Sequence, residues 1–308
     1  MTTTMAPRRR DHMIKAYFRR TNEGFEPLEL AHSDWNWAHL HGVSVSGLLA
    51  CGAEDALRGL DREHFVPARF HVDLSRPTRA AFTTVASEVV RSSSRLTQID
   101  VRLHQSGNVA ARGSALFLRP SENPDGDIWT PSDRGAPPPL SIAPASEEPR
   151  PPYIGSDQPW SARFGDHQNA GRHQTWHTAV PIIIDEPMST FQGVAALADT
   201  ASMVANWGSA GIGYINTDVS LTLARRPVGM EIGLRTLDHV QHQGVAVAAV
   251  EVYDRCGPLG NASITALANT RRALDYSAHE RAEAQTLTAE HTTGEASGRR
   301  APGAMPQP

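Results

Sequence analysis

Asp199 is the side chain whose surroundings in the sequence best suit acid–base chemistry. In a helix its neighbours at i−4, i−3 and i+4 would be Ala195, Ala196 and Met203, so its carboxylate would face an apolar environment. A carboxylate is costly to bury without partners, and desolvation raises its pKa and makes it a stronger base. Small alanine neighbours also leave room for a water or a substrate atom. In the alternative interpretation, Asp199 bonds to the backbone or to Thr200 and only fixes the position of the helix.

Polar side chains that could complement this base follow at Asn216, Thr217 and Asp218. A side-chain amide can donate a hydrogen bond to a developing oxyanion. So can the backbone N–H groups at the start of a helix, where negative charge is favoured, and the apolar run that begins at Gly42 offers such a start. In the alternative interpretation, Asn216 and Asp218 are ordinary residues between a glycine-rich loop and a strand.

The 14 histidines and two cysteines form no recognisable metal-binding pattern. There is no Cys–His cluster and no His-Glu-x-x-His spacing, so neither a metal nor a redox cofactor is expected. Gly211-x-Gly213 is too short for a dinucleotide-binding fingerprint, and the chain has no Gly-x-Ser-x-Gly elbow. His41, directly before the first apolar run, is a candidate for substrate binding or, as the simpler interpretation, for capping and packing.

Several landmarks recur about 150 residues apart and indicate that one unit has been duplicated. They are His41-Gly42 with Gln192-Gly193, 151 apart; Arg76-Pro77 with Arg226-Pro227, 150 apart; and the turn glycines Gly107 and Gly257, also 150 apart. Steady offsets of this kind are typical of a repeated domain. Because the unit occurs only twice, the pattern favours two like domains packed as a pseudo-dimer over a solenoid of three or more repeats.

Each unit reads as one apolar helix followed by strands. The first helix is predicted over 43–57, with Gly59 as a stop signal, and the second over 193–207. Alternating polar and apolar residues around 97–103 have the period of a half-buried strand, and Ser106-Gly107-Asn108 is a hairpin signal. The predicted strands are 68–74, 83–90, 96–103 and 110–118 in the first unit, and 219–223, 231–234, 245–253 and 262–268 in the second. This order predicts an α+β fold in which an antiparallel sheet wraps around a helix.

The composition is that of a globular chain with two domains of ordinary size. A net charge of −4 argues against nucleic-acid binding, no apolar run is long enough for a membrane span, and Arg8-Arg9-Arg10 is not followed by the apolar stretch of a secretory signal. Two cysteines, Cys51 and Cys256, fit a reducing, cytoplasmic compartment. We expect disordered tails at 1–12 and 277–308, domains at 13–119 and 160–276, and a Pro-rich linker at 120–159.

The order of short motifs resembles the double-hotdog acyl-CoA thioesterases of the type II kind. The segments that carry the resemblance are Trp35, 39–42, 65–70 and 74–77 in the first half, and 198–202, 215–221 and 226–231 in the second. The resemblance covers about 250 residues and leaves out the tails and the linker. It implies an α+β fold of two tandem hotdog domains, each an antiparallel sheet wrapped around a long apolar helix.

In that family an Asp on the second helix, a hydroxyl or amide on the next strand and a Gln on the last strand activate a water. The resemblance places Asp199 as the Asp, and Asn216, or its neighbour Thr217, where type II enzymes carry Thr. The last strand, 260–266, has no Gln. Ile264 or a neighbour takes its place, and Thr265 is a candidate for supplying a hydroxyl there. The first half also departs from the family, with Gly42-Val43 where many relatives have two glycines.

The same resemblance suggests where the substrate would bind. His41, Gly42, Arg76 and Arg226 are the candidate substrate-binding residues, with the arginines either meeting coenzyme A phosphates or simply anchoring strand ends. The predicted function is hydrolysis of acyl-CoA thioesters in fatty acid metabolism, without cofactor. The alternatives are an enoyl-CoA hydratase, which would need an Asp/His pair, and a non-catalytic acyl-CoA-binding protein, which the missing Gln favours. Neither nucleic acid nor membrane is expected as a partner, and hotdog sheet edges make a homo-oligomer a further expectation.

Overall fold

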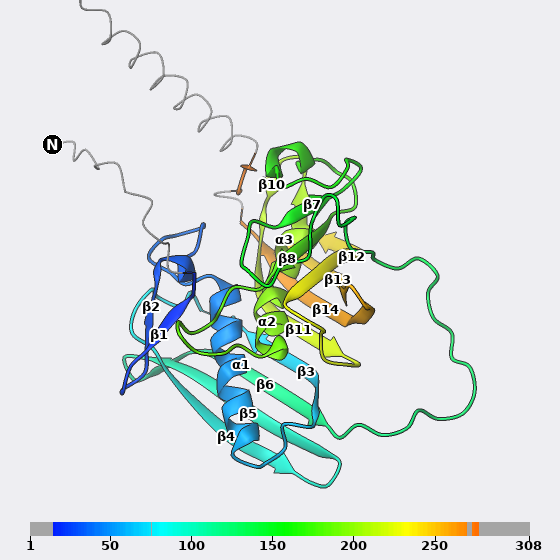
Figure 1. Ribbon diagram of the computed structural model, residues 1–308. Helices are drawn as coiled ribbons and strands as arrows, with labels where there is room; N and C mark the ends of the chain where they lie inside the picture. The colour runs from blue at the N-terminus through cyan, green and yellow to red at the C-terminus, as the bar shows by residue number, and fades with distance from the viewer. Residues whose placement is uncertain (1–14, 75, 270–272, 277–308) are drawn as a thin grey trace, which may run out of the picture.

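The computed structural model describes residues 15–74, 76–269 and 273–276 and is built on one ten-stranded antiparallel sheet. The strand order is β4-β5-β6-β3-β11-β14-β13-β12-β8-β7 (Figure 1). The strands are β3 (Val66–Asp73), β4 (Thr84–Ser92), β5 (Leu96–Gln105), β6 (Asn108–Leu118), β7 (Tyr153–Gly155), β8 (Gln174–Thr178), β11 (Tyr214–Leu223), β12 (Glu231–His242), β13 (Val245–Asp254) and β14 (Gly257–Ala268). The eight strands predicted from the sequence are all present, several of them longer than predicted.

Small elements flank this sheet. They are the hairpin β1 (Phe18–Arg20) and β2 (Phe25–Pro27), the pair β9 (Trp207–Gly208) and β10 (Gly211–Ile212), and the 3₁₀ turns η1 (Glu29–Ala31) and η2 (Phe164–His167). The hairpin turn predicted at 106–108 joins β5 to β6, where Ser106 and Gly107 both have positive φ angles. No helix among the described residues is long and apolar enough to cross a bilayer.

The first helix, α1 (Gly42–Arg58), packs against β4, β5 and β6 (Figure 1). It is buried without interruption from Ser44 to Glu54, which agrees with the prediction of a helix covered on most sides. It ends at Arg58, directly before Gly59, as predicted. The strands beneath it supply an apolar inner face, with Ile99, Val101 and Leu103 of β5 fully buried.

The prediction of one continuous second helix over 193–207 is wrong, because the helix is interrupted. The segment is α2 (Thr190–Leu197), a 3₁₀ turn η3 (Ala198–Thr200) and α3 (Ala201–Asn206). The Thr200 hydroxyl donates a 2.6 Å hydrogen bond to the Leu197 carbonyl. Side-chain bonds of this kind compete with the regular helical ladder, and the resulting tight turn places Asp199 at the break.

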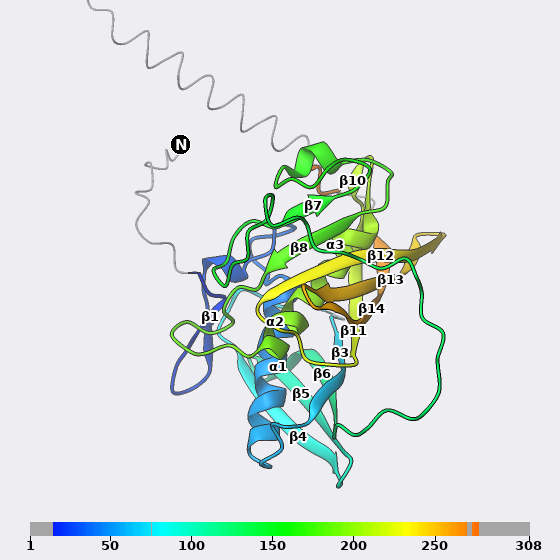
Figure 2. The ribbon, with the colours of Figure 1, turned by 45° about the vertical axis from the view of Figure 1, so that its right-hand side comes forward.

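The two halves form one sheet and one core. β3 of the first half pairs with β11 of the second, for example Val72 with Val219. The helices α1 and α2 also lie side by side, as Figure 2 shows. Gly47 of α1 permits this approach, because a Cβ atom there would lie 3.2 Å from that of Ala196. The antiparallel pairing and the shared core fix the position of one half against the other.

The segment predicted as a linker is anchored along the second half. Residues 119–152 contain no helix or strand and run around the outside of the molecule (Figure 1), whereas 153–155 form β7 at the edge of the sheet. Arg235 donates to the Asp133 carboxylate at 2.9 Å, and the Gly135 N–H donates to Glu251 at 2.7 Å. The predicted tails, 1–12 and 277–308, lie outside the described residues, as does Arg8-Arg9-Arg10.

Candidate active site

Asp199 lies where the broken helix of the second half meets the start of α1. Its Oδ1 accepts a 2.8 Å hydrogen bond from Asn216 Nδ2, and the backbone N–H of Val43 also donates to its carboxylate. Burial raises the pKa of Asp199 to about 6, against the lowering effect of these two hydrogen bonds. A carboxyl group with this pKa is ionised near neutral pH and is a stronger base than an exposed aspartate.

Gly42 allows the two halves to meet at this carboxylate. A Cβ atom on Gly42 would lie 2.2 Å from Asp199 Oδ1, closer than any real contact of that kind. The N-terminus of α1, with its positive end of the helix dipole, therefore faces an acidic group from the other half of the chain. The arrangement explains why a glycine stands at the start of α1.

His41 is the N-cap of α1. Its Nδ1 accepts a 3.0 Å hydrogen bond from the Ser44 N–H, and its Nε2 donates to the Leu30 carbonyl at 2.7 Å. Both ring nitrogens are thus engaged in a neutral imidazole, and burial lowers the pKa of His41. Tyr17 covers the ring edge-on, with centroids 5.1 Å apart. In this structure His41 caps the helix, although it also lines the neighbouring cavity.

A cavity of about 560 Å³ opens directly over Asp199. Its polar wall includes Asp199, Asn216, Thr217, His41 and the exposed Arg76. Its other walls carry many apolar and aromatic side chains, including Trp35, Leu74, Met203, Ile212, Tyr214 and Tyr276. A mostly apolar cavity with a few convergent polar groups is typical of a small-molecule binding site.

Asn216 and Thr217 come to this cavity at a β-bulge of β11, between Asn216 and Asp218. Asn216 faces Asp199, while the Thr217 hydroxyl lies 2.8 Å from that of Thr265. Thr265 is exposed, also bonds to Asp218 and does not line the cavity. The structure therefore brings Asn216 and Thr217 to Asp199's cavity but leaves the Thr265 side chain outside it.

The β14 position across from Asn216 is Ala266, which is buried. Cross-strand neighbours share one face of a sheet, so this methyl group stands where a polar side chain from the last strand would reach the site. Ile264 instead pairs with Val219, further into the core. Ala266 is thus the β14 residue opposite Asn216, whereas the sequence alone left the position of the expected Gln open between Ile264 and its neighbours.

Arg226 lies away from the cavity and joins the two halves. Its guanidinium donates to Glu54 at 3.1 Å and to the carbonyls of Glu63 and Phe65 at 3.2 and 2.9 Å. Ser189 donates to the other oxygen of Glu54 at 2.5 Å. A partly buried carboxylate paired in this way anchors the strand end to α1, so the structure assigns Arg226 the anchoring role and gives it no place in the substrate site.

Sequence reasoning missed the wall formed by residues 274–276. The Leu274 and Ile212 backbones exchange two 3.0 Å hydrogen bonds, and Gly211, at a φ of 88°, leaves space for them. Tyr276 packs its ring against Trp207, with centroids 5.3 Å apart. No local pattern in residues 274–276 predicts that they line a pocket, because the residues that they contact are about 60 positions away in the chain.

Comparisons with known proteins bear on the family and the fold. Residues 31–118 match the family model of the acyl-CoA thioesterase N-terminal domain. The predicted resemblance to this family is confirmed by that match, which covers 88 of the 308 residues. A search of curated proteins finds no significant match.

Among the described residues, no group of three or more His, Cys, Asp or Glu side chains is arranged to bind a metal.

Several solved structures share the architecture. The tesB protein of Mycobacterium avium subsp. paratuberculosis is 15% identical, with a TM-score of 0.55 over 82% of this chain and 95% of that one. A putative thioesterase II from Thermobifida fusca is 13% identical, with a TM-score of 0.60 over 83% and 98%. A protein of unknown function with a hot dog fold from Alicyclobacillus acidocaldarius is 15% identical, with a TM-score of 0.58 over 85% and 100%. At these identities the similarity establishes the hotdog fold.

Proposed function

We propose that this protein hydrolyses acyl-CoA thioesters with Asp199 as the general base. The observation that carries the proposal is a carboxyl group with a pKa near 6 at the floor of a largely apolar cavity, held by the α1 N-terminus and Asn216. The match of residues 31–118 to the acyl-CoA thioesterase N-terminal domain supports the reaction class. The cavity's apolar walls suit an acyl chain, and Arg76 at its mouth suits coenzyme A phosphates.

In the proposed reaction, a water between Asp199 and the thioester is the nucleophile. Asp199 removes a proton as the water oxygen attacks the carbonyl carbon, and a tetrahedral intermediate with a negative oxygen forms. The intermediate collapses, the C–S bond breaks, and the proton held by Asp199 passes to the leaving sulfur. The products are the free acid and the coenzyme A thiol, and no other reactant is required.

The negative oxygen needs donors that are already in place. Asn216 has two amide N–H groups, of which one bonds to Asp199, so the other is available for the water or the oxyanion. The α1 N-terminus beside Gly42 adds a favourable dipole. Asn216 and the N-terminus of α1 therefore stabilise the negative oxygen of the intermediate, while Asp199 acts as the base.

We propose the finer domain organisation on the same evidence. Two tandem hotdog domains, 13–119 and 160–276, would each wrap an antiparallel sheet around a helix and would be joined by the segment 120–159. The packing of α1 on β4–β6 and of α3 on β11–β14 supports this organisation. A cytoplasmic location and a homo-oligomer built through sheet edges remain proposals.

Two other functions were considered, and one has a specific observation in its favour. A hydratase would need a histidine to exchange protons beside Asp199, but both ring nitrogens of His41 are engaged, Nδ1 in capping α1 and Nε2 with the Leu30 carbonyl. A non-catalytic acyl-CoA-binding protein is favoured by Ala266, which leaves the site without a third polar group from the last strand. Turnover separates this second candidate from the thioesterase.

The test is release of free thiol from acyl-CoAs of short to long chain length. We expect turnover by the wild-type protein and a loss of at least about 100-fold in Asp199→Ala, the scale of general base catalysis. Asp218→Asn, two positions beyond Asn216 on β11, is the matched control for loss of a carboxylate. Turnover that survives in Asp199→Ala would refute the assigned base. Binding without any turnover would establish the binding protein instead.

A further inference from the structure

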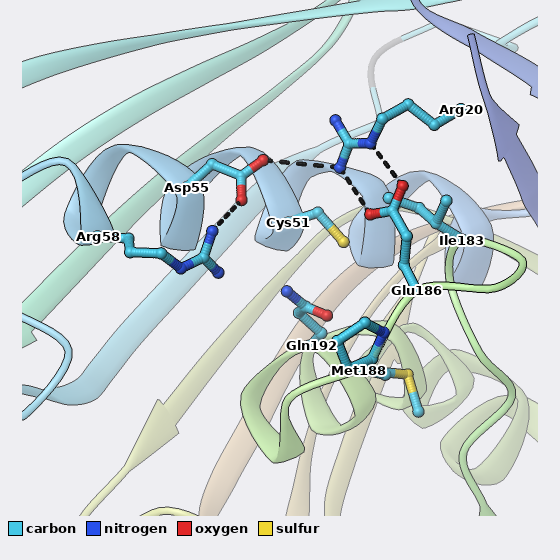
Figure 3. Close-up of a pocket in the computed structure, with 9 residues that line it drawn as sticks. Arg20, Cys51, Asp55, Arg58, Ile183, Glu186, Met188 and Gln192 are labelled. Carbon is cyan, nitrogen blue, oxygen red and sulfur yellow. Dashed lines mark hydrogen bonds and ion pairs between the residues drawn. The ribbon is translucent and has the colours of Figure 1, made fainter.

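A second cavity, of about 330 Å³, lies between α1 and the segment that leads into α2. Figure 3 shows its lining side chains along α1 and on the segment below it. Cys51, Ile183 and Met188 give it an apolar part that includes two sulfur atoms. Its polar lining consists of Arg20, Asp55, Arg58, Glu186 and Gln192.

This cavity is the counterpart of the candidate active site under the duplication. The offset of 151 residues relates His41 to Gln192 and Ser202 to Cys51, and each of the four lines its own cavity. The loops that lead to the helices correspond as well. Residues 33–35 line the first cavity, and their counterparts at 184–186 include Glu186 in the second. Three separate segments therefore support the same correspondence between the residues of the two cavities.

The residue that would supply a base is missing from the second cavity. The same offset places Leu48 at the position of Asp199, and Leu48 is completely buried in the core. No carboxylate of the described chain stands at this point. The second cavity therefore keeps the shape of the duplicated unit but lacks the group that activates water in the first.

The charged groups of the second cavity neutralise one another. Arg20 donates to both oxygens of Glu186, at 2.7 and 2.9 Å, and lies 3.8 Å from Asp55. Arg58 donates to the other oxygen of Asp55 at 2.8 Å. Two arginines thus face two carboxylates, so the lining has no excess of either charge. An uncharged ligand segment suits such a wall better than an anion or a cation.

Gln192 offers the unused hydrogen-bond donors. Its Oε1 accepts the Ser189 N–H in the capping box of α2, whereas its Nε2 makes no hydrogen bond within the described chain. The side chain is only 7% exposed, and Figure 3 shows its amide directed into the space below α1. Two amide N–H groups beside an apolar floor match a carbonyl oxygen that carries an apolar chain.

We propose that this cavity is a second, non-hydrolytic binding site for a short-chain acyl thioester. The Gln192 amide binds the carbonyl oxygen, and the acyl chain lies against Cys51, Ile183 and Met188. The smaller volume, about 330 against 560 Å³, restricts the chain to shorter lengths than the first cavity takes. The inference rests on the proposed function, because that function names acyl thioesters as the ligands of the duplicated unit.

The experiment uses the full chain and butanoyl-carba(dethia)-coenzyme A, in which a methylene replaces the thioester sulfur so that it is not hydrolysed. Calorimetry should give two molecules bound per chain. In a Cys256→Ser background Cys51 is the only cysteine. The analogue should then slow labelling of Cys51 by methyl methanethiosulfonate at least about tenfold.

The matched variant is Gln192→Glu, which keeps an acceptor for the capping box but removes the amide donors. We expect it to bind one molecule per chain and to lose protection of Cys51. One molecule per wild-type chain, with Cys51 unprotected and thiol release from acyl-CoAs intact, would overturn the second site alone. Absence of both binding and thiol release would overturn the proposed function and this inference with it.

Discussion

Replacing Asp199 by Asn should make the folded protein more stable at pH 8 while it removes activity. A group whose pKa is higher in the folded than in the unfolded chain stabilises the fold when protonated. That contribution is complete below the unfolded pKa and is lost as the pH rises through the folded pKa. For Asp199 the two values are 3.8 and about 6, so wild-type stability falls between about pH 4 and pH 6. An Asn side chain does not ionise and escapes this loss.

The magnitude follows from the pKa difference. One pKa unit corresponds to about 1.4 kcal/mol, so the rise from 3.8 to about 6 gives an upper value of about 3 kcal/mol. Because the Asp199 side chain is only half-buried and reaches the cavity, solvent screens part of this cost. We therefore expect Asp199→Asn to gain about 1–3 kcal/mol over the wild type at pH 8 and little at pH 4.

The assay is urea unfolding of both proteins at pH 4, 6 and 8, with thiol release measured in parallel. Asp218→Asn is the control, since it removes a carboxylate from β11, two positions beyond Asn216, but not the one that faces α1. The reasoning would be refuted if Asp199→Asn were equally or less stable than the wild type at pH 8. The ionised carboxylate would then be well satisfied by Asn216 and Val43, and its pKa would not be raised.

Four further results are expected. Thiol release should fall tenfold per pH unit below about pH 6, where Asp199 is protonated, and a flat profile would exclude it as the base. Gly42→Ala should lower turnover at least about tenfold by displacing that carboxylate, while Gly59→Ala, where the nearest atom is 3.5 Å from the new Cβ, should not. Ala266→Gln should raise turnover over Ala266→Leu, its apolar control; equal rates would show that no third polar group is needed. His41→Ala should lower the free energy of unfolding by about 1 kcal/mol, and His41→Asn should restore most of it, as measured in urea.

Local patterns in the sequence were enough to predict the first helix and eight of the ten strands of the large sheet. The alternation around Ile99 and Val101 marks a strand because side chains of a strand point to opposite faces in turn. The positive φ angle of Gly107 is one that glycine readily adopts, so the turn at Ser106-Gly107-Asn108 was predictable too. The break at η3 was not, because a continuous run of small and apolar residues favours a helix whether or not Thr200 bonds back to Leu197.

The sequence also singled out Asp199, as a carboxylate in an apolar run, and the family resemblance pointed to Asn216 or Thr217 as its partner. What it could not decide is which distant groups face them. Val43 meets Asp199 across about 150 residues, and Arg226 meets Glu54 across 172. These contacts depend on how the two halves of the chain pack together. The spacing of about 150 residues between the sequence landmarks is compatible with many such packings.

The sequence by itself therefore predicted the first helix, eight strands of the sheet and Asp199 as the candidate base. Only the tertiary structure decided that the α1 N-terminus holds this residue, that Ala266 occupies the last-strand position beside it, and that Thr265 points outward. The physical reason is that residue type and period are local properties. A raised pKa, a close approach at Gly42 and a shared cavity arise only when segments far apart in the chain are packed together.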